Sequence, residues 1–171
     1  MRWAGRGGLA AAVLCAACAS VEPPPATVVS GRLSVHVAAH AGQPARGVNA
    51  AFDLQGNAEA GELRLSTPLG PQVAAARWAP GLARLVTGDG EKSYADLASL
   101  AYDALGESLP LQALPDWLSG RPWPGAASQA HADGFAQLGW TIDLAGWDQG
   151  FVSAHRASEP PVTLRVRLER P

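Results

Sequence analysis

The chain has 171 residues, of which 47% are hydrophobic and 16% charged, a composition typical of one globular domain with its own core. The formal net charge of −2 excludes a general nucleic-acid-binding protein, because the basic residues are scattered and form no basic face. The densest group of cations, Arg165, Arg167 and Arg170, fits the solvent side of a strand near the C-terminus.

The N-terminus is typical of a secretory signal peptide. Arg2 and Arg6 precede the apolar run LAAAVLCAAC, which at about ten residues is too short to span a bilayer as a helix. Two alanines stand directly before Cys18, which resembles the bacterial lipobox, where small residues precede a cysteine that becomes lipidated. We therefore expect a lipoprotein signal peptide over residues 1–17 and a lipid on Cys18.

The sequence before Cys18 differs from the usual lipobox at one position, and the two cysteines have one alternative interpretation. Cys15 stands three residues before Cys18, where a leucine is usual. A disulfide or redox pair between the two cysteines is disfavoured, because both lie in or beside the hydrophobic stretch, with no folded scaffold around them. Ala19 after Cys18 fits sorting to the outer membrane in the usual enterobacterial pattern.

Residues 18–28 contain three consecutive prolines and are expected to form an extended tether behind the lipidated cysteine. The folded domain is expected over residues 29–171. It begins at VVSGRLSVHV, where apolar residues such as Leu33 and Val35 alternate with polar ones, as in a strand with one face in solvent. Four more short runs predict an antiparallel meander: GVNAAFDLQ, AGELRLS, QVAAARWA and LARLVTG.

The stretch STPLGP lies between two of these predicted strands. Thr67-Pro68-Leu69-Gly70 fits a type I turn, with proline at the second position and glycine at the fourth. Leu69 is unusual there, because a leucine at the tip of a hairpin has little to pack against.

The apolar spacing becomes helical in DLASLAYDALG, where Leu97 and Leu100 share a face and Gly106 stands at the C-cap position. Pro115 interrupts the next apolar stripe, so we expect a short turn followed by a short helix. The residues of that stripe are Leu111, Leu114, Trp117 and Leu118.

Strands are predicted again after the helices. In FAQLGWTIDLAGW we expect one face made of Ala136, Leu138, Trp140, Ile142 and Leu144, and the opposite face made of Gln137, Thr141 and Asp143. VTLRVRLER alternates in the same way. About five strands, a helical insert and two or three further strands together predict an antiparallel sheet curled around or covered by helices.

No catalytic motif stands out, so we expect neither an enzyme nor a cofactor. The chain contains no GxSxG, HExxH or glycine-rich phosphate loop, and GDGEK near residue 90 is expected to be a tight hairpin turn. Its four histidines are scattered, which disfavours a metal site. Asp143 and Asp148 are expected to be ordinary solvent-facing carboxylates.

Five phrases, in this order, resemble the LolB family: VSGRLSV, LRLSTPLGPQVA, LVTGDGEKSYA, ALGESLPLQALPDWLSGRPWPG and GFAQLGWTIDL. The likeness covers about residues 29 to 170. Two departures are Phe52-Asp53-Leu54, where many relatives have an aromatic-x-Trp, and a C-terminal strand without the tryptophan often found near its end. The resemblance implies an incomplete antiparallel β-barrel that encloses an apolar cavity, is covered by a short helical lid and holds acyl chains.

The same resemblance implies a lipid-anchored receptor of the outer membrane that faces the periplasm. Such a receptor accepts lipoproteins from a LolA-like periplasmic carrier by binding their acyl chains, and inserts them into the inner leaflet of the outer membrane. We expect it to act as a monomer, without nucleic acid. Pro68, Leu69 and Gly70 match the family's membrane-insertion loop. The candidate cavity and lid residues are Leu33, Val35, Leu63, Leu65, Leu97, Leu100, Leu111, Trp117, Leu118 and Trp140.

Several alternatives stay open at this point. The half-barrel could be a binding module for another hydrophobic ligand, such as free lipid or glycolipid, or a structural envelope lipoprotein with a filled core. Leu69 could be a chance exposed leucine or could fold back onto the sheet. The candidate lid residues could equally be ordinary core, since a lid and a core look the same in sequence. Arg32 is expected to face solvent rather than the lid.

Overall fold

The computed structural model describes residues 28–169. The predicted signal peptide over residues 1–17, Cys18 and the tether up to residue 27 lie outside the described residues. Every strand and helix below lies within 28–169, so a form that begins at residue 19 contains all the elements described here.

The described residues form one open antiparallel sheet of 11 strands, in the order β6-β5-β4-β3-β2-β1-β11-β10-β9-β8-β7. The first and last strands of the chain pair at the centre, and the edges β6 and β7 do not meet. The prediction of an incomplete antiparallel β-barrel is therefore confirmed. The strands are β1 (Val29–Val37), β2 (Arg46–Gly56), β3 (Gly61–Ser66), β4 (Gln72–Ala79), β5 (Leu82–Thr87), β6 (Gly90–Tyr94), β7 (Ser128–His131), β8 (Gly134–Gln137), β9 (Trp140–Asp143), β10 (Phe151–Arg156) and β11 (Val162–Leu168).

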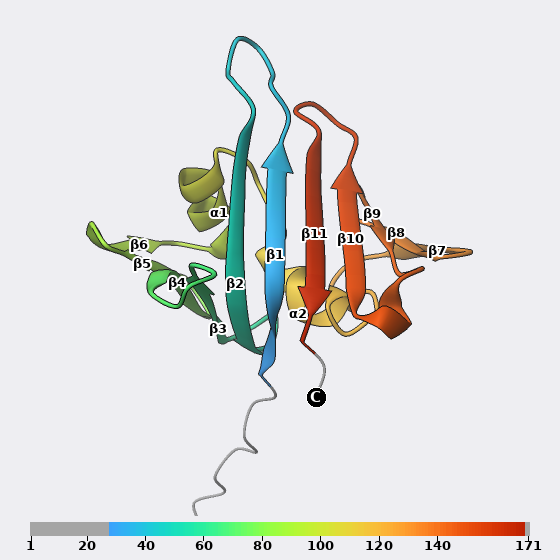
Figure 1. Ribbon diagram of the computed structural model, residues 1–171, viewed down its shortest axis with the longest axis horizontal. Coiled ribbons are helices and arrows are strands. Elements are labelled where there is room, and N and C mark those ends of the chain that lie inside the picture. The colour runs from blue at the N-terminus through green and yellow to red at the C-terminus, as the bar shows by residue number, and fades with distance from the viewer. Residues whose placement is uncertain (1–27, 170–171) are drawn as a thin grey trace, which may run out of the picture.

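Figure 1 shows β2, β1, β11 and β10 standing upright at the front, with the outer strands of the sheet turning away behind them on both sides. The helices α1 (Leu97–Leu105) and α2 (Leu114–Trp117) lie behind the upright strands (Figure 1). The sheet thus has an inner face, toward the helices, and an outer face. Alternation along each strand sends apolar side chains inward, and Val35, Phe52 and Leu54 are all at least nine-tenths buried.

The helical insert begins and ends as its sequence predicts. The Asp96 carboxylate accepts a hydrogen bond from the Ser99 N–H at 2.7 Å, which lowers the pKa of Asp96 and caps the N-terminus of α1. Gly106 ends the helix with a φ of 72°, a conformation that glycine adopts without strain. A 3-10 helix, η1 (Leu111–Ala113), leads directly into α2, whose first turn contains Pro115. No helix among the described residues is long and apolar enough to cross a membrane.

The prediction of one shared apolar face through FAQLGWTIDLAGW is wrong. Leu138 and Gly139 have φ values of 54° and 77° and form a two-residue hairpin turn of the primed kind between β8 and β9. Gln137 and Trp140 therefore pair across the hairpin and both are buried, while Leu138 is exposed at the turn. The sequence reasoning also missed β7 and β10, so five strands follow the helices rather than two or three.

Candidate functional site

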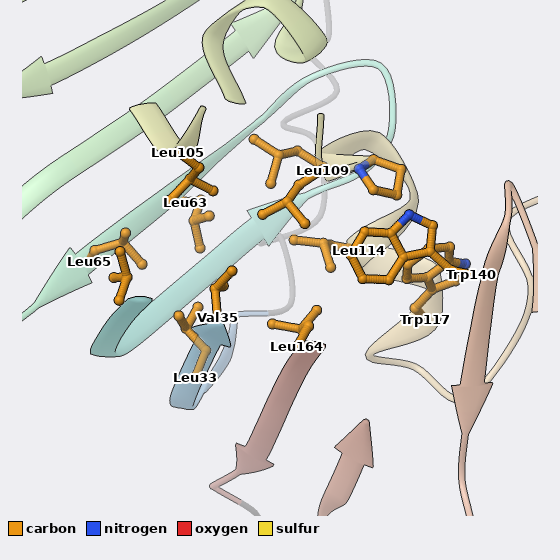
Figure 2. Close-up of a pocket in the computed structure, with 13 residues that line it drawn as sticks. Leu33, Val35, Leu63, Leu65, Leu105, Leu109, Leu114, Trp117, Trp140 and Leu164 are labelled. Atoms are coloured by element: carbon orange, nitrogen blue, oxygen red, sulfur yellow. The ribbon is translucent and has the colours of Figure 1, made fainter. Parts of the chain in front are cut away.

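An apolar cavity of about 70 Å³ lies between the inner face of the sheet and the helical segment. We call residues 97–118, which run from α1 through η1 to α2, the lid. Figure 2 shows leucine, valine and tryptophan side chains from both sides converging on this space. The 13 residues that line it are all hydrophobic or proline: Leu33, Val35, Val48, Leu63, Leu65, Leu105, Leu109, Pro110, Leu111, Leu114, Trp117, Trp140 and Leu164.

The structure brings most of the predicted cavity residues together. Those that line the cavity are Leu33, Val35, Leu63, Leu65, Leu111, Trp117 and Trp140. Leu97, Leu100 and Leu118 do not line it and are buried in the surrounding core. The sequence analysis did not include Leu109 and Pro110, in the turn between α1 and η1, among the cavity residues. They lie in a stretch without helical or strand periodicity, which therefore does not indicate where their side chains point. The remaining lining residues that were not predicted are Val48, Leu105, Leu114 and Leu164.

The cavity is too small for a long acyl chain in this state of the lid. A cavity of about 150 Å³ holds a single benzene molecule, and one water occupies about 30 Å³ in the liquid. The space of about 70 Å³ is less than half of the benzene-sized cavity. A long apolar ligand can therefore enter only if the lid moves away from the sheet.

The centre of the lid is tied to the sheet by Arg156, at the end of β10. Its Nη2 donates to the Glu107 carboxylate at 2.7 Å and to the Pro160 carbonyl at 3.2 Å, and its Nη1 donates to the Ser108 carbonyl at 3.3 Å. The guanidinium carbon also lies 5.7 Å from the ring centroid of Trp140, which lines the cavity. Among the described residues, the Arg156 Nε is the buried side-chain polar atom without a hydrogen-bond partner.

The two ends of the lid are held by different contacts. At α1, Asp103 accepts hydrogen bonds from the Tyr94 hydroxyl at 2.6 Å and from Lys92 at 3.2 Å, both on the edge strand β6. These contacts lower the pKa of Asp103, and the hydrogen bond to Asp103 raises the pKa of Tyr94. At α2, the Trp117 indole N–H donates to the Gln137 side chain at 2.8 Å.

Gln137, on β8, connects the β8–β9 hairpin with the segment that comes after the lid in the sequence. Its amide oxygen accepts from Trp117 and from the Trp123 backbone N–H, and its amide nitrogen donates to the carbonyls of Trp123 and Ala126, all within 2.7–2.9 Å. These four bonds leave no polar atom of a nearly fully buried side chain unpaired. They explain why the phrases WLSGRPWPG and QLGW, far apart in sequence, lie together.

The loop between β3 and β4 projects from the sheet. The Gly70 N–H donates to the Thr67 carbonyl at 3.0 Å, as the predicted turn requires, and the Thr67 N–H donates to the Pro71 carbonyl at 2.9 Å. Leu69, at the tip, is 96% exposed, so it does not fold back onto the sheet. The closed turn holds a leucine side chain away from every apolar surface of the domain.

Comparisons with a family model and with individual known proteins all match this chain to one family. The chain matches the model of the family described as outer membrane lipoprotein LolB over residues 27–171. It is 32% identical to the outer-membrane lipoprotein LolB of Bordetella petrii, over 97% of this chain and 92% of the relative. Proteins of the same name from Cupriavidus pinatubonensis and Chromobacterium violaceum are 29% and 37% identical, over 95% and 67% of this chain and 84% and 61% of their own lengths.

Proposed function

Since the chain belongs to the LolB family of outer-membrane lipoproteins, we propose that it accepts lipoproteins from a periplasmic carrier and inserts them into the outer membrane. The acyl chains of the cargo bind in the cavity beneath the lid. In this proposal residues 1–17 direct export, a lipid on Cys18 anchors the protein so that it faces the periplasm, and residues 18–28 tether the domain.

The apolar cavity carries the proposal. Exposing an acyl chain to water costs about 0.8 kcal/mol per methylene, so a cargo lipoprotein needs an apolar cavity at each step outside a membrane. Every residue that lines this cavity is hydrophobic or proline, so the lining offers carbon surface for an acyl chain. Transfer then needs no catalysis, because the cargo moves from carrier to receptor to bilayer as its chains become better buried.

Acceptance of cargo requires the lid to open, because the cavity of about 70 Å³ is too small for a long chain. The contacts that hold the lid differ in strength. Asp103 holds α1 through an exposed ion pair, which is worth little, whereas the Arg156–Glu107 pair is about 85% shielded from water. The Arg156–Glu107 pair is therefore the contact whose release frees the centre of the lid.

Leu69 serves the delivery step in this proposal. Burial of one leucine in a bilayer contributes about 2 kcal/mol, which is too little to hold a protein at a membrane. The acyl chains on Cys18 supply the anchoring, since stable attachment takes more than one chain. Leu69 instead provides a local apolar contact through which the loaded domain meets the bilayer and releases its cargo.

The test is acceptance of cargo by a form that begins at residue 19. The form is mixed with carrier loaded with a fluorescent lipoprotein, and the label that it takes is measured after separation. Leu65→Trp fills the cavity, while Leu85→Trp adds the same bulk at a partly buried leucine that does not line it. We expect Leu65→Trp to lose acceptance and Leu85→Trp to keep it.

Two results would contradict the proposal. If both variants accept cargo like the unmodified form, the cavity is not the site that receives the acyl chains. If no form takes lipoprotein but the unmodified form takes up free phospholipid, the domain is a lipid-binding module of another kind.

A further inference from the structure

Three arginines lie side by side on the outer face of the sheet. In the antiparallel pairing of β1 with β11, Arg32 lies directly opposite Arg167, and Ser34 lies opposite Arg165. All three arginines are exposed, and they alternate with residues such as Leu33 and Leu164 that line the cavity on the other side. We call Arg32, Arg165 and Arg167 the cationic face.

The cationic face has no carboxylate partner among the described residues, unlike most cations of the domain. Arg64, Arg77, Arg84, Lys92, Arg121 and Arg156 all form ion pairs, whereas Arg32, Arg165 and Arg167 form none. Two nearby carboxylates accept other hydrogen bonds, Asp53 from the Ser30 hydroxyl and Asp143 from the Ala145 N–H. The exposed Glu169, two residues after Arg167, forms no ion pair with any of the three arginines. Like charges opposite each other on a sheet are destabilising, so an anionic ligand here would relieve repulsion.

Apolar side chains lie beside these arginines on the same face. A groove of about 370 Å³ is bounded by the cationic face, by Phe151 and by Pro68 of the projecting loop. Phe151 is 46% exposed, and the Arg167 guanidinium carbon lies 5.4 Å from its ring centroid. Because Pro68 borders this groove, the loop that carries Leu69 and the cationic face belong to one continuous surface.

We propose that this surface is the one with which the domain lies on the membrane, and that the cationic face binds the phosphate groups of anionic phospholipids. Guanidinium groups pair with phosphate oxygens in a bidentate manner, and an exposed apolar ring such as that of Phe151 gains by burial beneath the headgroups. Leu69 then enters the acyl layer. The inference rests on the proposed function in two respects, the role of Leu69 in delivery and the lipid on Cys18.

The occupant is a bilayer rather than an acidic protein for two reasons. The arginines share their surface with Leu69, at 96% exposure, and with Phe151, and this mixture of cations and isolated apolar groups matches a membrane interface. Cys18 also stands only 11 residues before Val29, a length that reaches about 40 Å at most, so a lipid on Cys18 keeps β1 near the bilayer.

Vesicle binding by the form that begins at residue 19 tests the inference, since this form lacks the lipid anchor. Binding is measured by flotation with vesicles of phosphatidylethanolamine and phosphatidylglycerol, and with phosphatidylethanolamine and phosphatidylcholine. Each arginine near an anionic surface strengthens binding by about fivefold at low ionic strength, so the triple variant Arg32→Gln/Arg165→Gln/Arg167→Gln should lose about a hundredfold. The Arg→Lys triple variant keeps the charge but loses the bidentate pairing, so its binding should lie between those of the unmodified form and the Arg→Gln variant.

The matched control removes the same charge elsewhere. Arg84→Gln/Lys92→Gln/Arg121→Gln removes three cations whose side chains are 50–69% exposed, and should bind the anionic vesicles almost as well as the unmodified form. Equal loss in both triple variants overturns the inference, because net charge alone would then explain the binding. Equal binding of the unmodified form to both kinds of vesicle also overturns it, and this comparison needs no variant.

Acceptance of cargo from the carrier, without vesicles, separates this inference from the proposed function. We expect the Arg→Gln triple variant to accept cargo normally and to bind anionic vesicles weakly. If it loses acceptance but still binds vesicles, the cationic face docks an acidic protein and the inference is wrong. If no form accepts cargo, the proposed function fails, while the vesicle result still decides the role of the arginines.

Discussion

Arg156 and Glu107 join the two sides of the cavity, with 2.7 Å between the Arg156 Nη2 and a Glu107 carboxylate oxygen. Arg156 ends a central strand of the sheet, whereas Glu107 lies in the lid between α1 and η1. Both side chains are about 85% buried, so water screens their attraction only weakly. The pair is therefore placed to set how easily the lid opens.

Glu107→Gln should loosen the lid. The substitution leaves the Arg156 guanidinium without its anionic partner in a largely dry site, and we expect a loss of roughly 2–3 kcal/mol in the free energy of unfolding. An environment-sensitive apolar dye should bind roughly tenfold more tightly, because the open state becomes more populated. Glu91→Gln makes the same chemical change at an exposed pair and should alter neither quantity. Unchanged dye binding in Glu107→Gln would show that this pair does not restrain the lid.

Gln137→Leu should destabilise the whole domain. The variant removes four hydrogen bonds and leaves the Trp117 indole N–H and backbone groups of Trp123 and Ala126 unpaired in the interior. We expect a loss of about 3–5 kcal/mol in urea unfolding. Gln129→Leu, at an exposed position on β7, is the control and should change stability by less than about 0.5 kcal/mol. Similar stability of the two variants would contradict the role of Gln137.

Glu62 should make stability depend on acid pH. It is a buried carboxylate on β3: burial raises its pKa, but hydrogen bonds from Arg77, Arg64 and Gln55 outweigh burial and hold the pKa below the ordinary value of 4.5. A carboxylate with a lowered pKa stabilises the fold above its unfolded-state pKa, and this contribution is lost as pH falls through the lower folded-state pKa.

The measurement is urea unfolding of the unmodified protein and of Glu62→Gln at several pH values between neutral and strongly acidic. We expect Glu62→Gln to be less stable by about 1–2 kcal/mol near pH 7, because it loses charged hydrogen bonds. The difference should shrink below pH 4.5. A difference that stays constant down to acid pH would mean that the Glu62 charge contributes nothing to the fold.

Much of the fold is predictable from local chemistry. The alternation of apolar and polar residues correctly predicted which side chains of β1 and β11 are buried, and Gly106 correctly predicted the end of α1. Both predictions succeed because they depend only on residues close together in the sequence. The β3–β4 turn followed from Pro68 and Gly70 for the same reason. The resemblance to the LolB family is confirmed by the family match over residues 27–171.

The errors arose at residues whose conformation or burial depends on tertiary contacts. QLGW looks like part of one strand, but Leu138 and Gly139 both adopt positive φ and reverse the chain. Gln137 was placed opposite the apolar face because it is polar, and only its contacts with Trp117 and Trp123 explain its burial. The turn at Leu109 was missed as part of the cavity because a loop has no periodicity to show which way its side chains point.

Delivery to the bilayer can be followed in one assay that contains every step of the proposed function. Fluorescent lipoprotein is loaded on the carrier, mixed with a form that begins at residue 19, and then exposed to vesicles. Leu69→Glu places a charge on a fully exposed turn, so the fold and the cavity are left intact. Leu69→Ala removes most of the apolar surface without adding charge.

We expect the unmodified form to take the label and pass it to the vesicles, Leu69→Ala to pass it more slowly, and Leu69→Glu to take it but retain it. That pattern separates the cavity, which accepts the cargo, from the loop, which delivers it. If Leu69→Glu delivers as well as the unmodified form, Leu69 has no part in insertion. If none of the three forms takes label from the carrier, the receptor function itself is wrong.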